Sequence, residues 1–174
     1  MQTVNTWADY VPAAMRTNSG KTGSFGNQSC DFAHACLGIV SEINEIRHAK
    51  SMTDIFLEKG DLAWFIALAY QAIEMRPPAF ELLPITSTGI ANDQADLCDL
   101  GKKWFAHGKI NSEMRQLMSG ILANLIVHYS LNLDVLNGNL GKLYARYPSC
   151  YNTEDQAKRN KKNEMVTALL NKAA

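Results

Sequence analysis

The sequence has no excess of either charge and no long apolar run. Its 174 residues include 17 Lys and Arg against 17 Asp and Glu, so the formal net charge is zero. A balanced charge gives no whole-molecule attraction to nucleic acid or to an anionic membrane. No apolar stretch approaches the roughly 18 residues of a membrane span, and the N-terminus lacks the basic start and apolar core of a secretion signal. We therefore expect a cytoplasmic protein that binds neither nucleic acid nor membrane, and that meets any charged ligand at a local site.

Cysteine pairs and a complete glycine-rich phosphate loop are also missing. The segment SGKTG, from Ser19 to Gly23, resembles the end of a phosphate-binding loop, but Met15 stands where the first glycine belongs and no strand precedes it. We interpret this segment as a flexible loop. The cysteines form no CxxC pair and are too sparse for a disulfide framework, which favours free thiols in a reducing compartment. They are Cys30, Cys36, Cys98 and Cys150.

Strand signals are weak throughout, whereas the spacing of apolar residues indicates helices. From about residue 28 to residue 50, apolar residues recur at intervals of three and four, which is the period of an amphipathic helix. Ser51 and Thr53 offer N-caps for a second helix, which runs up to Pro77. The pattern predicts an antiparallel helix hairpin with a short turn.

Three further helices are predicted after the hairpin. They span Asn92–His107, Ser112–Tyr147 and the tail 149–174. The middle one would be long before Pro148 ends it, and Gly138 and Gly141 could bend it. Because neither internal repeats nor a second domain are visible, we expect one all-α domain, a helical bundle built on the hairpin. Its parts would be an N-terminal segment at 1–27, a poorly readable insertion at 76–110 and the tail helix, within a single domain at 1–174.

Acidic residues lie on both hairpin helices among apolar neighbours. Residues three apart share a helix face, so each helix would carry a two-pronged acidic ridge, and each ridge lies roughly 10 Å from the turn. Facing carboxylates repel one another and raise one another's pKa unless a cation neutralises them. Oxygen-only ligation suits Mg²⁺ or Mn²⁺, and a solvated acidic face is the alternative. The four residues are Glu42, Glu45, Glu58 and Asp61.

Neighbouring residues offer weaker alternatives for a metal site. Glu45 and His48 form an ExxH element like those of di-iron bundles, but no second ExxH follows, so we interpret His48 as a surface residue or as a residue that contacts a metal ligand rather than the metal. His34 lies on the same stripe as Glu42 and is interpreted as a packed polar residue. Asp54 is assigned to the N-terminus of the second helix, where a negative charge is favourable.

Three motifs of the sequence together carry a resemblance to a known family. The ExxE and ExxD pairs are separated by twelve residues, within LGIVSEINEI and EKGDLAWFIALA, and NLGKLYARYP follows downstream. These stretches resemble the LGLxGExGEx, ELGDVLWYLA and NxxKLxxRYP segments of the all-α nucleoside triphosphate pyrophosphohydrolases of the MazG type, which include phage and bacterial MazG-like proteins. Ser41 and Asn44 depart from the small, glycine-type positions of the first family motif.

The resemblance implies a reaction and a set of site residues. In such enzymes divalent ions held by four acids bind the triphosphate, and an activated water releases pyrophosphate and leaves a nucleoside monophosphate. Carried over by position, the four acids would bind Mg²⁺, with Mn²⁺ as a substitute, and Glu42 or Glu45 would also be the catalytic base. The residues that would bind the ribo- or deoxyribonucleoside triphosphate are Asn139, Lys142, Arg146 and Tyr147. Arg159 is the candidate for the family's C-terminal arginine.

Some expectations stay open at this point. The rival function, from another class, is a catalytically silent nucleotide- or metal-binding regulator on the same bundle. The wide apolar stretches Phe65–Ile73 and Ile121–Val127 favour a homodimer or homotetramer. The resemblance places the protein in a bacterial cytoplasm or a phage-infected host. The base is not identified by the sequence, and the aromatic candidates for stacking on it are Trp7, Tyr10, Phe25, Trp64 and Tyr147.

Overall fold

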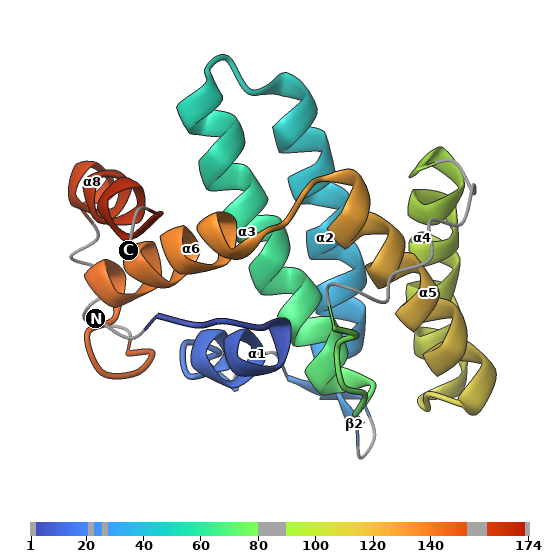
Figure 1. Ribbon diagram of the computed structural model, residues 1–174. Coiled ribbons are helices and arrows are strands. Elements are labelled where there is room, and N and C mark those ends of the chain that lie inside the picture. The colour runs from blue at the N-terminus through green and yellow to red at the C-terminus, as the bar shows by residue number, and fades with distance from the viewer. Residues whose placement is uncertain (1–2, 21–22, 26–27, 80–89, 153–159, 173–174) are drawn as a thin grey trace.

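The computed structural model describes residues 3–20, 23–25, 28–79, 90–152 and 160–172 (Figure 1). Within this part of the chain, seven helices dominate and two strands of two residues each form a small antiparallel pair. In chain order the elements are α1 (Trp7–Met15), β1 (Ser24–Phe25), β2 (Gln28–Ser29), α2 (Asp31–His48), α3 (Met52–Ala72), α4 (Ile90–His107), α5 (Ser112–His128), α6 (Leu133–Arg146) and α8 (Lys161–Lys172). The all-α class predicted from the sequence is confirmed.

The helices α2 and α3 form the predicted hairpin, and their short connection follows from local capping. The Ser51 hydroxyl accepts a hydrogen bond from the Asp54 N–H at 3.0 Å, which satisfies one of the free donors at the start of α3. The predicted end of α3 at the prolines is wrong, because the helix stops at Ala72. Glu74 has a φ of 54°, and the Met75 N–H bonds back to the Tyr70 carbonyl, so a left-handed residue closes the helix first.

The single long helix predicted from Ser112 to Tyr147 is also wrong, because α5 and α6 are separate helices. Ser130 has a φ of 50°, and the Leu131 N–H bonds to the Ile126 carbonyl, which ends α5. Asn132 then caps α6, since its side chain accepts from the Val135 N–H at 3.2 Å. The predicted C-terminal end of this region at Tyr147 is confirmed.

Gly138 and Gly141 lie inside α6, where they allow α8 to lie against it. A Cβ at Gly141 would lie 2.7 Å from the Thr167 carbonyl oxygen, and a Cβ at Gly138 would lie 3.2 Å from the Ala168 carbonyl oxygen. Figure 1 shows α8 beside the end of α6, near the two chain ends. The predicted tail helix exists but begins at Lys161. Arg159 lies outside the described residues.

Helix α1 was not predicted, because no element was assigned to the N-terminal segment. It is capped by Thr6, whose side chain accepts from the Asp9 N–H at 3.1 Å. Trp7 and Tyr10 are fully buried, and α1 packs against α3 and α6. The helix therefore covers a part of the core that the hairpin leaves open.

The 76–110 segment contains α4, which packs on α2, and its residues 80–89 lie outside the described part. The two apolar stretches that favoured an oligomer are largely covered within one chain. In the first stretch, Leu68 and Tyr70 are fully buried, and in the second, Leu122 and Leu125 are. These stretches therefore give no reason to expect a partner. Across the described residues, no helix has both the length and the apolar character needed to cross a membrane.

Candidate functional site

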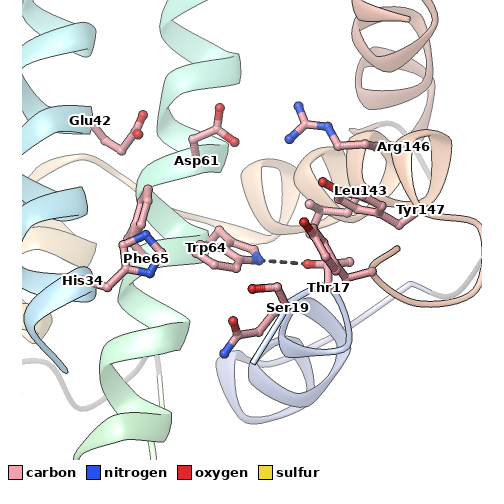
Figure 2. A pocket seen from close by; sticks show the side chains of 12 residues that line it. Thr17, Ser19, His34, Glu42, Asp61, Trp64, Phe65, Leu143, Arg146 and Tyr147 are labelled. Carbon is pink, nitrogen blue, oxygen red and sulfur yellow. Dashed lines mark hydrogen bonds between the residues drawn. The ribbon is translucent and has the colours of Figure 1, made fainter. Parts of the chain in front are cut away.

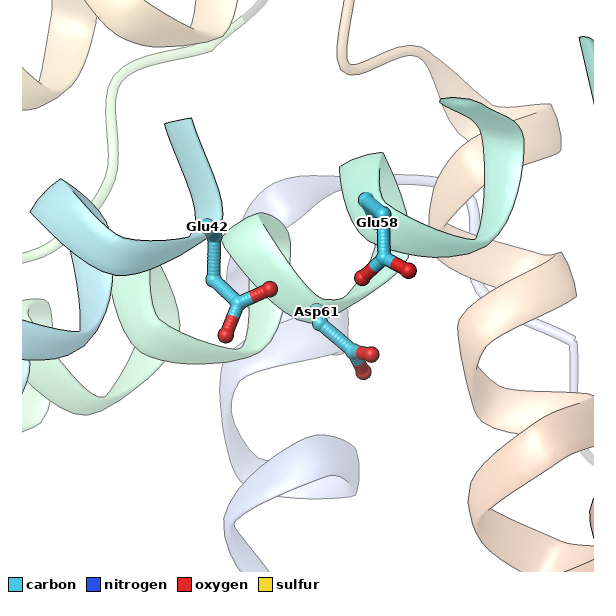
Figure 3. A group of neighbouring side chains, drawn as sticks. All are labelled: Glu42, Glu58 and Asp61. Atoms are coloured by element: carbon cyan, nitrogen blue, oxygen red, sulfur yellow. The ribbon is translucent and has the colours of Figure 1, made fainter. Parts of the chain in front are cut away.

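Three of the four predicted acids meet between the hairpin helices (Figure 3). Glu42 comes from α2, while Glu58 and Asp61 come from α3, and one oxygen of each carboxylate lies within 4.8 Å of the others. Figure 3 shows the three carboxylates directed toward a shared space. All three side chains are partly exposed. The spacing argument from the sequence therefore identified a real cluster.

The packing of two glycines explains why the acids come level. Gly38 lies against the Phe65 ring, where a Cβ would be only 2.2 Å from a ring carbon. One turn closer to the connection between the two helices, Glu42 faces Asp61. Gly60, next to Asp61, lets α6 approach α3 closely. The absence of side chains at these positions sets the distance between the helices that carry the site.

Burial and electrostatic repulsion both act on the pKa of the acids. Burial, the largest cause, and the charges of Asp61, Glu45 and Glu58 together raise the pKa of Glu42 from 4.5 to about 8, against an opposing effect of Lys142. Burial and Asp61 likewise raise the pKa of Glu58. A cluster of this kind favours the binding of a cation, because a positive charge removes both the repulsion and part of the cost of burial.

Glu45 lies outside this cluster. Its side chain is exposed, and its carboxylate accepts a hydrogen bond from the Ser41 hydroxyl at 3.4 Å. Its charge nevertheless contributes to the raised pKa of Glu42. Glu45 is therefore a neighbour of the three acids rather than a member of the group. The nearby His48 is exposed, with Nδ1 2.8 Å from the Asn44 carbonyl oxygen, as expected for a surface residue.

Lys142 reaches the acids from α6. Its Nζ donates to the Asp61 carboxylate at 2.5 Å, and its side chain is only 6% exposed. The sequence assigned Lys142 to the substrate, whereas the structure places it on an acid of the cluster. An ammonium has three donors, so one contact with Asp61 leaves capacity for a second acceptor.

Asn139, one turn earlier on α6, is buried below the site. Its Oδ1 accepts from the Tyr10 hydroxyl at 2.7 Å, and within the described part of the chain its Nδ2 has no hydrogen-bond partner. Burial raises the pKa of Tyr10, and the charge of Asp61 raises it further. Asn139 packs on Gly60, where a Cβ would lie 3.0 Å from Nδ2. Asn139, which was predicted to contact substrate, is not among the residues that line the cavity described below.

A cavity of about 390 Å³ opens beside the acids (Figure 2). Glu42 and Asp61 lie at one side, and Arg146 lies across from Asp61. Most of the remaining wall is aromatic, and the Trp64 indole N–H is held by the Thr17 hydroxyl at 2.9 Å. The lining residues are Thr17, Asn18, Ser19, His34, Glu42, Asp61, Trp64, Phe65, Leu143, Arg146, Tyr147 and Tyr151.

Two of the predicted substrate residues, Arg146 and Tyr147, line this cavity. The Tyr147 ring lies 5.3 Å from that of Tyr151 between centroids, and the Arg16 guanidinium donates to the Tyr147 carbonyl at 2.8 Å. The Arg146 guanidinium donates to both carboxylate oxygens of Glu164, from Nε at 3.1 Å and from Nη2 at 2.7 Å. Sequence reasoning did not find Glu164, because no local signal joins α8 to α6.

Other cavity residues were missed or interpreted differently. His34 was interpreted as a packed residue, and its ring does pack edge-on against Phe65, with centroids 5.3 Å apart, but it also lines the cavity. Ser19 belongs to the segment that was interpreted only as a flexible loop, and Thr17 lies in the N-terminal segment, where no site residue was predicted. Of the other stacking candidates, Trp7 and Tyr10 lie in the core rather than in the cavity wall.

Comparison of the chain with protein-family models, with curated proteins and with solved structures finds no match. What the site does has to follow from its own chemistry.

Proposed function

We propose that this protein hydrolyses a ribo- or deoxyribonucleoside triphosphate to the monophosphate and pyrophosphate with the help of a divalent metal ion. One observation supports this most: two carboxylates of the acid cluster, Glu42 and Asp61, lie with Arg146 on the wall of the same aromatic-lined cavity. A metal bound to the acids neutralises a polyphosphate from one side, and an arginine does so from the other. The resemblance of the sequence to MazG-type hydrolases supports the same reaction.

The acids fit a hard divalent ion such as Mg²⁺ or Mn²⁺. All the donors are carboxylate oxygens, and the pKa of Glu42 is raised by burial and by repulsion from the neighbouring acids, both of which such an ion would offset. Glu42, Glu58 and Asp61 would hold it. When bound, the ion would neutralise phosphate charge and make a bound water more acidic.

The chain's own residues would bind and orient the substrate. Arg146 would bind phosphate oxygens, and Lys142 would hold the Asp61 carboxylate in place while offering a donor to the same phosphates. Trp64 and Phe65 would cover the base and exclude water from that side. The volume of the cavity, about 390 Å³, lies within the usual range for small-molecule sites.

The reaction needs a group that accepts the proton of the attacking water. Glu45 is exposed beside the cluster, so it is the acid we assign to this role. In the proposed step, water oxygen forms a bond to the α-phosphorus and the bond between that phosphorus and the bridging oxygen to the β-phosphate breaks. The proton passes to Glu45 and the electron pair leaves with pyrophosphate.

A screen of the common ribo- and deoxyribonucleoside triphosphates with Mg²⁺, with products separated by ion-exchange chromatography, tests the proposal. We expect monophosphate and pyrophosphate in equal amounts, and Asp61→Asn should abolish their formation. Asp99→Asn is the matched control, because it changes an exposed aspartate of α4 that pairs with Lys102 and Lys103 of its own helix. Binding of nucleotide without any turnover would replace the proposal with the rival function, a silent nucleotide- or metal-binding regulator.

The proposal includes assembly as a homodimer or homotetramer. Several large apolar side chains are exposed on α8, among them Leu170 at 72% and Val166 at 43%. Light scattering at micromolar concentration should give a multiple of the 19.3 kDa chain mass. A mass equal to that of one chain would refute this part of the proposal.

A further inference from the structure

The buried carboxylate of Glu164 is the partner that fixes Arg146 at the cavity wall. Two parallel hydrogen bonds join the side chains, from Nε to Oε1 at 3.1 Å and from Nη2 to Oε2 at 2.7 Å. The side chain of Glu164 is 4% exposed and that of Arg146 is 16% exposed. Two hydrogen bonds in the plane of the guanidinium fix its orientation, which a single contact would not do.

The position of Glu164 is set by the close packing of α8 on α6. The two glycines of α6 let the backbone of α8 approach, and a Cβ at Gly141 would lie 2.8 Å from the Cβ of Asn171. The Asn171 side-chain amide donates to the Asn137 carbonyl at 2.5 Å, and both of these residues are buried. The carboxylate of Glu164 is therefore placed by a closely packed helix crossing and not by a loop.

The pair leaves part of the guanidinium available to a ligand. Arginine has five N–H donors. Glu164 takes two, and the Tyr147 side chain, which lines the same cavity, also hydrogen-bonds Arg146, so the remaining donors are those open to a ligand. Arg146 lines the cavity, and Figure 2 shows its guanidinium directed toward the space beside Asp61. The edge that faces away from Glu164 is the one that a phosphate in the cavity would meet.

We propose that Glu164 is a positioning residue, which holds the Arg146 guanidinium in the orientation that binds a phosphate group of the substrate. The proposal rests on the proposed function, since it takes the cavity to hold a polyphosphate. It differs from two other roles for the same ion pair. Glu164 could merely attach α8 to α6, or it could neutralise Arg146 and so weaken anion binding. The three roles predict different effects of Glu164→Gln on the affinity for an anion: a decrease if Glu164 positions Arg146, no change if it only attaches α8, and an increase if it neutralises Arg146.

The experiment measures binding of inorganic tripolyphosphate in Mg²⁺ by titration calorimetry, together with kcat and KM for the best triphosphate. The proteins are the wild type, Glu164→Gln, Arg146→Ala, the double variant and Arg146→Lys. Glu74→Gln is the matched control, because it removes a carboxylate from an exposed ion pair with Arg115, away from the cavity lining. Thermal unfolding of each variant separates effects on folding from effects on binding.

We expect Glu164→Gln to weaken tripolyphosphate binding and to raise KM, each by about 10-fold, the equivalent of one charged hydrogen bond, with a smaller change in kcat. The double variant should bind no more weakly than Arg146→Ala alone, because Glu164 acts only through Arg146. Arg146→Lys keeps the positive charge but cannot make two parallel hydrogen bonds to Glu164, so its affinity for tripolyphosphate should fall as in Glu164→Gln. This variant gives the same test if Glu164→Gln does not fold.

Other outcomes overturn the proposal. Unchanged binding in Glu164→Gln with a lower melting temperature would mean that the pair only attaches α8. Tighter binding in Glu164→Gln would mean that Glu164 competes with the anion for Arg146. Additive losses in the double variant would mean that Glu164 does not act through Arg146. If the wild type with Mg²⁺ binds no tripolyphosphate and hydrolyses no triphosphate, the proposed function fails, and with it the role of Glu164.

Discussion

Glu42→Gln is expected to stabilise the metal-free protein at alkaline pH, although the substitution removes a residue of the proposed metal site. Burial, with the added charges of Asp61, Glu45 and Glu58, raises the pKa of Glu42 from 4.5 to about 8. Ionising this carboxyl is therefore more costly in the folded chain than in the unfolded chain. Glutamine has almost the same shape and no charge, so it removes this cost.

The direction and size of the effect follow from proton linkage. Between pH 4.5 and about 8 the folded chain keeps a proton on Glu42 that the unfolded chain has released, so stability falls as the pH rises through this window. If the whole pKa shift acted on folding, it would lower the free energy of unfolding by about 5 kcal/mol, at roughly 1.4 kcal/mol per pKa unit. Glu42 keeps contact with water, which screens the repulsion, so we expect about 2 kcal/mol near pH 8.5. For a chain of this length, that is roughly 4–8 °C in melting temperature.

The assay is thermal unfolding in EDTA from pH 5 to pH 9. The melting temperature of the wild type should fall across this range, whereas that of Glu42→Gln should fall less and exceed the wild type at high pH. Glu74→Gln, which changes an exposed glutamate, should run parallel to the wild type. Mg²⁺ should reverse the order, because it binds the wild-type cluster and stabilises the folded state by mass action. A Glu42→Gln curve parallel to or below the wild type in EDTA would refute the repulsion.

Asp61→Asn should weaken Mn²⁺ binding, measured by electron paramagnetic resonance, by at least about 10-fold, the effect seen even for outer partners of metal ligands. Glu45→Gln should weaken it less, and equal losses would make Glu45 an equal ligand. Lys142→Met keeps the apolar stem but leaves Asp61 unpaired, so the free energy of unfolding in urea at pH 7 should fall by about 1–3 kcal/mol; an unchanged urea midpoint would contradict this. Gly141→Ala places a Cβ 2.7 Å from a carbonyl of α8 and should cost about 1–3 kcal/mol. Gly120→Ala has nothing within 4 Å and should stabilise α5 by about 1 kcal/mol, so equal effects would contradict the close α6–α8 crossing.

Local signals were sufficient for several elements and would have been sufficient for others. Ser51 was expected to cap α3, and it does so. Asn132 caps α6 by the same means, yet the apolar residues on both sides of it led to the prediction of one long helix. Thr6 and Asp9 form a reciprocal pair at the start of α1, which is a capping signal in the sequence that was not used. These errors come from the competition between apolar periodicity and capping, not from missing information.

The acid cluster was predictable because its geometry follows from two short-range regularities. Residues three apart on a helix share a face, and a short turn makes two helices antiparallel, so acids at similar distances from the turn come level. Three of the four predicted acids meet as expected. The exposed position of Glu45 was not predictable, because side-chain orientation depends on neighbours from other parts of the chain.

The sequence by itself determined the helical class, the hairpin and the level of its acids, since hydrophobic period and capping act within a few residues. Only the tertiary structure decided what stands opposite those acids. Lys142 meets Asp61 across 81 residues of chain, and Arg146 meets Glu164 across 18. Both pairs depend on glycines that let helices approach, Gly60 toward α6 and Gly141 toward α8. A glycine in a helix has the same local sequence pattern whether it faces solvent or another backbone, so the sequence does not show which helices approach closely. Only the packing shows which basic side chains come to lie beside the acids and the cavity.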